Sequence, residues 1–330
     1  MPVHPQTRRL REFLDSCAEL LGPDPSIEEM RRLIGSPFAL ERRELPHVRD
    51  LTVHGEGGPV PVRLYRPAGR SPLPALVYFH GGGWVIGGPD NVDAACREFA
   101  ARAGCAVLSV DYRLAPEHPF PAAVQDAWAV TAAATGEPGR FGVDPQAVAV
   151  AGDSAGGNLA AVVALLARER GVRLVHQLLV YPATDTAMDT ASYAAYGTGY
   201  GLDAGSMGRF MRLYQGDADP ADPRLAPLRA PDLAGAAPAT VITAEYDVLR
   251  DEGEAYARRL QEAGVPVLLR RYEGMVHSFF LLPELFDTGV EAMDLAVRRL
   301  RAAFETPGNG TAPIREDTRW ARRGTAGTSG

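Results

Sequence analysis

The feature that most constrains this chain is the pentapeptide Gly-Asp-Ser-Ala-Gly at 152–156, because of what surrounds it. Apolar residues fill positions 147–151 before it, and a run of small and apolar residues follows it to about residue 170. This order predicts a buried strand, a sharp turn and a helix. In such a turn the hydroxyl of Ser154 stands out from the end of the strand, and the flanking glycines leave room for neighbouring main chain.

Three further sequence elements commonly accompany a serine turn of this kind, and here they occur in the expected order along the chain. A His-Gly-Gly-Gly loop at 80–83 follows the apolar run 75–79, and Asp247 and His277 come later in the chain. A serine hydroxyl becomes a nucleophile when an adjacent base takes its proton. We therefore predict Ser154 as nucleophile, His277 as general base and Asp247 as the acid that orients the imidazole.

The acid and the base each have competitors in the sequence. Asp251 and Glu252 are alternatives to Asp247, although they fall in the first turn of a predicted helix, where carboxylates are common for electrostatic reasons. His277 is preferred among the seven histidines because it follows the last predicted strand, where a loop can carry it over the serine turn. His80 is better explained as a side chain that holds the shape of its glycine loop.

The glycine loop predicts hydrogen-bond donors for a developing oxyanion. The backbone N–H groups of Gly82 and Gly83, together with that of Ala155, are the expected donors. The glycines do not match G-x-G-x-x-G at the start of a helix, which argues against a dinucleotide site. We interpret the charged segment 111–117 as an ion-pair network that holds nearby loops, without a catalytic role.

Composition excludes several other functions. The net charge of −7 argues against a nucleic-acid partner. All 34 basic residues are arginine, which excludes a lysine Schiff base, a Ser-Lys dyad and a Walker lysine. The three cysteines, at 17, 96 and 105, have no metal-like spacing and predict neither a disulfide framework nor a metal site. The longest uniformly apolar run covers nine residues, 159–167, whereas a membrane helix needs about 20. We expect a soluble, cytoplasmic protein without membrane insertion.

Strand and helix patterns alternate through most of the chain. They predict an α/β fold with a mostly parallel eight-stranded sheet and helices on both faces. A glycine-rich turn makes the first two strands an antiparallel hairpin. The predicted strands are 48–53, 60–65, 76–79, 106–110, 147–151, 178–181, 240–244 and 267–271. The predicted helices are 91–103, 121–135, 154–170, 249–263 and 287–304.

Two segments do not follow this alternation. Residues 1–45 show helical periodicity before any strand, and Ser26 with Glu29 forms a predicted capping box. Between 183 and 230 the alternation stops in a segment rich in aromatic residues and methionine. An insertion of this length is usually functional. We expect both segments to form a helical cap on a catalytic domain at 46–305, followed by a disordered tail at 306–330.

Five motifs together resemble the hormone-sensitive-lipase-like branch of the α/β-hydrolase fold, the bacterial family IV carboxylesterases. They are HGGGW at 80–84, DYRLAPEHPFP at 111–121, GDSAGG at 152–157, DVLRDE at 247–252, and His277. The resemblance runs from about residue 40 to 305.

The resemblance implies specific roles for the residues of these motifs. It implies Ser154, Asp247 and His277 as a triad, with Asp247 favoured over Asp251. It also implies an oxyanion hole from Gly82, Gly83 and Ala155, and no cofactor or metal. One departure is Ser278, where the family commonly has glycine.

The expected activity is hydrolysis of small-molecule carboxylic esters through an acyl-enzyme, with short to medium acyl chains. An amidase, a formamidase or a deacetylase of a specialised metabolite is the alternative, because the same oxyanion chemistry serves both kinds of bond. A non-catalytic receptor is a third interpretation, which the presence of His277 disfavours. Many members of the family pair through the edge strand, here 267–271, so the resemblance also raises a homodimer as an assembly to test.

Overall fold

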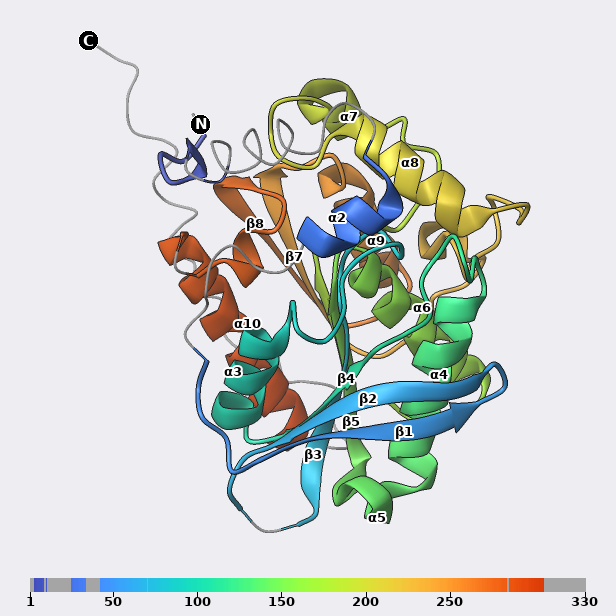
Figure 1. Cartoon of the computed structure of the whole chain (residues 1–330), viewed down its shortest axis with the longest axis vertical. Coiled ribbons are helices and arrows are strands. Elements are labelled where there is room, and N and C mark those ends of the chain that lie inside the picture. The colour runs from blue at the N-terminus through green and yellow to red at the C-terminus, as the bar shows by residue number, and fades with distance from the viewer. Residues whose placement is uncertain are drawn as a thin grey trace.

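One sheet organises the chain, with strands in the order β1-β2-β4-β3-β5-β6-β7-β8 (Figure 1). The computed structural model describes residues 3–8, 10, 25–33, 42–69, 71–283 and 285–305. Within these ranges the strands are β1 (His47–Gly55), β2 (Gly58–Arg66), β3 (Leu73–Phe79), β4 (Ala106–Val110), β5 (Val143–Asp153), β6 (His176–Val180), β7 (Ala239–Tyr246) and β8 (Val267–Val276). The β1–β2 and β2–β4 pairs are antiparallel, and all other neighbours are parallel. The predicted mostly parallel eight-stranded sheet is therefore confirmed.

Two layers of helices cover the sheet, as Figure 1 shows. On one face lie α3 (Asp93–Ala103) and α10 (Asp287–Glu305), and on the other α4 (Ala122–Gly136), α6 (Ala155–Glu169) and α9 (Arg250–Glu262). A short helix, α5 (Pro138–Phe141), leads into β5. The strands are buried on both sides, which explains their continuous apolar sequences.

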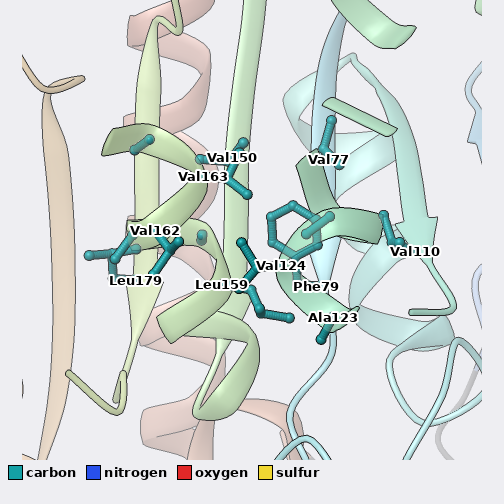
Figure 2. Packing of buried hydrophobic residues seen from close by; sticks show 14 of the residues in the cluster. Val77, Phe79, Val110, Ala123, Val124, Val150, Leu159, Val162, Val163 and Leu179 are labelled. Carbon is teal, nitrogen blue, oxygen red and sulfur yellow. The ribbon is translucent and has the colours of Figure 1, made fainter. Parts of the chain in front are cut away.

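Side chains along β3 alternate between two hydrophobic cores. Val77 and Phe79 belong to the cluster with α4 and α6, whereas Leu76 and Tyr78 belong to the cluster with α3 and α10. Figure 2 shows side chains of the first cluster, with Val150 of β5 among them. Deep burial on both faces fixes the register of the central strands, because a slip of one residue would exchange the two faces.

The remaining helices lie at the carboxyl ends of the parallel strands (Figure 1). They are α2 (Ile27–Leu33), α7 (Ala191–Tyr196), α8 (Ala204–Gln215) and the 3-10 turn η1 (Pro227–Arg229); a second 3-10 turn, η2 (Phe279–Leu281), follows β8. The predicted capping box of α2 is confirmed, because Ser26 N–H donates to Glu29 Oε2 at 2.8 Å and Glu29 N–H donates to Ser26 Oγ at 3.2 Å.

Parts of the sequence predictions fall outside the described residues. These parts are most of 1–24, residues 34–41 and the tail 306–330. No helix in the described ranges combines the length and the apolar character that crossing a membrane requires.

Candidate active site

Ser154 occupies a strained turn between β5 and α6. Its φ of 56° and ψ of −119° are rare for a residue with a side chain. The turn is held on both sides, since Ser154 N–H donates to Val180 O at 2.8 Å and Ser154 O accepts from Asn158 N–H at 3.0 Å. These hydrogen bonds, one to the neighbouring strand and one within the first turn of the helix, hold Ser154 in its strained backbone conformation.

The glycines on either side of Ser154 are required by close main-chain contacts. A Cβ on Gly152 would lie 2.2 Å from the oxygen of Gly156, and a Cβ on Gly156 would lie 1.9 Å from the oxygen of Phe79. Both distances are far below van der Waals contact, and the obstructing atoms belong to backbone. The turn therefore packs against β3 so closely that only glycine fits at these two positions.

Ser154, His277 and Asp247 form a continuous hydrogen-bonded chain. The Oγ of Ser154 lies 3.0 Å from His277 Nε2, and His277 Nδ1 lies 2.7 Å from Asp247 Oδ2. Asp247 follows β7 and His277 follows the neighbouring parallel strand β8, so both side chains emerge at the same edge of the sheet. Asp247 is 2% exposed, and Ser154 and His277 are each 8% exposed. This arrangement can pass the serine proton to the imidazole.

The glycine loop presents unpaired backbone donors beside Ser154. Gly82 and Gly83 have φ values of 115° and 60°, and within the described chain their N–H groups have no backbone or side-chain acceptor. Ala155 is the first residue of α6, so its N–H has no acceptor within the helix. These are the three donors predicted from the sequence, and Gly82 and Gly83 line the same pocket as Ser154.

Asp153 is a site residue that the sequence analysis missed. Its Oδ1 accepts hydrogen bonds from Gly81 N–H at 3.1 Å and from the Tyr78 hydroxyl at 2.9 Å. Burial raises the pKa of Asp153 to about 6, against hydrogen bonds that favour the charged form. The only sequence signal was its position next to Ser154, which gave no indication that it holds the glycine loop.

A pocket of about 400 Å³ surrounds the serine. One wall comes from α8, where Phe210 lies so close to Gly83 that a Cβ there would be 2.4 Å from the ring. Most of the remaining lining is apolar. Its other members include Leu10, Ile86, Val92, Leu202, Met207 and Leu281.

The residues that compete with Asp247 and His277 for these roles make other contacts. The carboxylate of Asp251 accepts from Ser192 N–H at 2.8 Å, and Glu252 Oε1 accepts from Thr184 N–H at 2.7 Å. His80 stacks on the ring of Tyr112 at 4.2 Å, and burial lowers its pKa to about 4.

Charged residues of the segment 111–117 pair with neighbouring elements. Arg113 pairs with Asp126 of α4, and Glu117 pairs with Arg31 of α2. The prediction that this segment forms ion pairs is confirmed for Arg113 and Glu117, although their partners lie on helices and not on loops. Across the described residues, no group of three or more His, Cys, Asp or Glu side chains is arranged to hold a metal ion.

The buried carboxyl group of Glu252 should make the stability of the protein depend on pH. Burial raises its pKa to about 8 from an ordinary value of 4.5. Between these two pH values the unfolded chain releases a proton that the folded chain keeps, so the free energy of unfolding falls as pH rises. We expect Glu252→Gln to gain stability relative to the native protein as pH increases from 4.5 to 8, with no further gain above 8. Thermal unfolding across this range measures the difference.

Glu262→Gln, at an exposed position of the same helix, is the matched control for that prediction. It should follow the native protein at every pH. A constant difference between Glu252→Gln and the native protein from pH 4.5 to 8 would contradict the assigned burial effect.

Comparisons with known proteins agree with this architecture. A family model described as alpha/beta hydrolase fold matches residues 76–281. The carboxylic ester hydrolase LipN of Mycobacterium tuberculosis is 46% identical over 263 residues, covering 77% of this chain and 70% of LipN. Esterase LipI of the same organism is 40% identical over 302 residues, covering 89% of this chain and 94% of LipI.

The similarity also holds for a solved three-dimensional structure. A hyperthermophilic esterase from the archaeon Pyrobaculum calidifontis is similar with a TM-score of 0.85 and 41% identity, covering 91% of this chain and 98% of its own. The sequence motifs, the sheet order and these similarities lead to one conclusion. The chain belongs to the α/β-hydrolase family, in its hormone-sensitive-lipase-like branch.

Proposed function

We propose that this chain hydrolyses carboxylic esters of small molecules, with Ser154 as nucleophile, His277 as general base and Asp247 as the orienting acid. The observation that carries the proposal is the hydrogen-bonded chain from Ser154 Oγ through His277 to Asp247, at 3.0 and 2.7 Å. The esterase names of relatives that are 40% identical or more over most of the chain support the same reaction.

In the first half of the reaction, Ser154 Oγ attacks the ester carbonyl carbon while its proton moves to His277 Nε2. The tetrahedral intermediate collapses, the C–O bond to the alcohol breaks, and the imidazolium returns the proton to the leaving alkoxide. The product of this half is an acyl-enzyme on Ser154 and a free alcohol. In the second half His277 takes a proton from water, the hydroxide attacks the acyl carbon, and the acid leaves as Ser154 recovers its proton.

The proposed oxyanion hole is formed by the N–H groups of Gly82, Gly83 and Ala155. The tetrahedral oxygen carries a negative charge that these donors stabilise, and each such donor typically contributes about 10²–10³ in rate. Support comes from the unpaired N–H groups of the two glycines beside the serine. Asp153 contributes indirectly, because it holds Gly81 at the start of the same loop.

We further propose that residues 1–45 and 183–230 together form a cap over a catalytic domain at 46–305. The supporting observation is that Leu10 from the first segment and Met207 and Phe210 from the second contribute to the pocket wall. A pocket of about 400 Å³ with mostly apolar walls fits esters of short to medium acyl chains.

Two finer proposals concern location and assembly. We place the enzyme in the cytoplasm, because Cys96 and Cys105 are buried free thiols, as expected in a reducing compartment. A homodimer that pairs through β8 is also proposed. This strand lies at one edge of the sheet, and its outer side has no strand partner among the described residues.

Turnover of p-nitrophenyl esters across a series of acyl lengths, beside matched p-nitroanilides, tests the proposed activity. We expect kcat/KM to peak at short or medium acyl chains, and we expect the esters to be turned over much faster than the anilides. Equal or faster turnover of the anilides would contradict the ester assignment and favour an amidase. No turnover of any substrate by the folded protein would contradict both.

A further inference from the structure

We propose that Asp251 is a positioning residue that ties helix α7 to the loop carrying Asp247. This inference depends on the proposed role of Asp247 as the acid of the reaction. Asp251 lies at the start of α9, four residues after Asp247, and its contacts are with α7 rather than with His277.

Ser192 of α7 makes three hydrogen bonds to the stretch 248–251. Its N–H donates to Asp251 Oδ2 at 2.8 Å, its hydroxyl donates to Val248 O at 2.6 Å, and its Oγ accepts from Asp251 N–H at 3.3 Å. Ser192 is fully buried. A shift of the stretch relative to α7 would therefore leave buried polar groups without partners, which is costly.

Arg250 provides a second connection between α7 and the same loop. Its guanidinium lies over the ring of Tyr196 at 5.0 Å and donates to the Tyr196 hydroxyl at 3.2 Å. It also donates to Glu245 O at 2.9 Å and to Asp251 Oδ1 at 2.8 Å. Helix α7 is thus joined both to the end of β7 and to the first turn of α9.

The end of β7 is in turn linked to the segment that carries the base. The carboxylate of Glu245 accepts from Gly274 N–H at 2.7 Å, three residues before His277. The contacts of α7 therefore extend, through Arg250 and Glu245, from the loop of the acid to that of the base.

The orientation of Asp247 depends on this loop. Its Oδ2 accepts from His277 Nδ1 at 2.7 Å, and its Oδ1 accepts from Leu249 N–H at 3.0 Å. A movement of 248–251 changes the direction of the Leu249 N–H and rotates the carboxylate away from the imidazole. Although burial raises the pKa of Asp251, its bonds to Arg250 and Ser192 keep that pKa below the usual range, so the connection stays charged at neutral pH.

The other end of the insertion contacts η1 and Glu252 of α9, and removing its contact with η1 while keeping the bonds to Glu252 offers a matched control. Arg229 of η1 pairs with the carboxylate of Asp185 at 2.5 Å, and Leu228 N–H donates to Thr184 O at 2.9 Å. None of these contacts involves residues 247–251. Replacing Arg229 should loosen the insertion without moving Asp247.

The test compares Asp251→Ala, Asp251→Asn and Arg229→Ala in pH–rate profiles with a short-chain p-nitrophenyl ester. We expect Asp251→Ala to lower kcat roughly ten- to a hundredfold with little change in KM, because the acid is misaligned. The acidic limb of the profile should move to lower pH, since a misaligned Asp247 stabilises the imidazolium less. Asp251→Asn keeps an acceptor for Ser192 N–H and should recover most of the activity.

Arg229→Ala, the control at the other end of the insertion, should change KM or acyl preference and keep the native acidic limb.

Asp153, whose pKa is about 6, and Tyr181, whose ring lies 4.6 Å from that of His277, also face the imidazole. Every variant retains them, so differences between the profiles report on Asp247.

If Asp251→Ala does not fold, Ser192→Ala tests the connection from the side of α7. It removes the two hydroxyl bonds to Val248 and to the backbone of Asp251, keeps the Ser192 N–H bond to the Asp251 carboxylate, and should give a smaller change in the same direction.

A substrate-free measurement separates this proposal from the proposed function. The low-field proton resonance of His277 Nδ1–H reports its hydrogen bond to Asp247 whether or not the protein turns over an ester. We expect this resonance to shift or broaden in Asp251→Ala and to stay in place in Arg229→Ala. A native resonance and a native acidic limb in Asp251→Ala, with only a lower melting temperature, would overturn the positioning role.

Discussion

Ser154→Ala is expected to lower kcat for ester hydrolysis by on the order of 10⁴–10⁶-fold. The variant lacks the oxygen that forms the acyl-enzyme, and the imidazole 3.0 Å away has no hydroxyl to activate. Binding of the ester should change little, because the pocket walls and the backbone donors remain. Initial-rate kinetics with purified protein, at enzyme concentrations high enough to detect residual turnover, measure the effect.

The matched control for this variant is Ser206→Ala. Ser206 lies on α8 and lines the same pocket, but its hydroxyl donates to Asp203 Oδ2 at 2.9 Å and takes no part in the chain to His277. We expect kcat within a few-fold of the native value, since exposed or partly buried helix substitutions of this kind have small effects. Comparable losses in both variants would mean that the effect reports on pocket structure and not on a nucleophile.

Gly156→Ala is expected to have the second large effect, on folding as well as on activity. The new methyl group would lie 1.9 Å from Phe79 O and 2.6 Å from His80 O, and neither atom belongs to a flexible side chain. The serine turn must then separate from β3 and from the start of the glycine loop. We expect a loss of roughly 3 kcal/mol or more in the free energy of unfolding. Turnover should fall at least about a hundredfold, because the serine and the oxyanion donors no longer align.

Gly136→Ala provides the comparison for that prediction. Gly136 ends α4, and a Cβ there would meet no atom within 4 Å. Alanine in a helix is favoured over glycine by about 0.5–1 kcal/mol, so this variant should be as stable as the native protein or more so. Urea denaturation of both variants measures the contrast. Native-like stability and turnover in Gly156→Ala would contradict the close packing of the turn.

Much of the fold follows from local sequence patterns. The buried strands β3, β4 and β6 are short apolar runs. The helices α4, α6 and α10 are too long for such strands, and α10 is also clearly amphipathic. The boundaries were less accurate. β5 begins at Val143, four residues before the predicted start, because its first residues pair with β3 through a register shift that no apolar pattern marks.

In the insertion, the sequence indicated helical character but not where each helix begins and ends. The segment was expected to contribute helices to a cap, but its sequence pattern indicated no bounds for them, and the structure places α7 and α8 between 191 and 215. Helix α7 has only six residues, too few for a periodic signal, and its position depends on tertiary contacts. Ser154, His277 and Asp247 could be predicted as candidates because each lies shortly after a predicted strand in a recognisable local sequence. The bond between Ser192 and Asp251 joins residues 59 positions apart, and only the folded chain brings them together.

The most direct test of the proposed chemistry is the site of covalent labelling by a p-nitrophenyl phosphonate, mapped by peptide mass spectrometry. A phosphonate reacts with an activated serine and remains attached. We expect a single adduct on Ser154 in the native protein and a strongly reduced rate of labelling in His277→Ala, because the base is missing. An adduct on another residue, or no adduct on a folded protein, would contradict the assignment of Ser154 as the nucleophile.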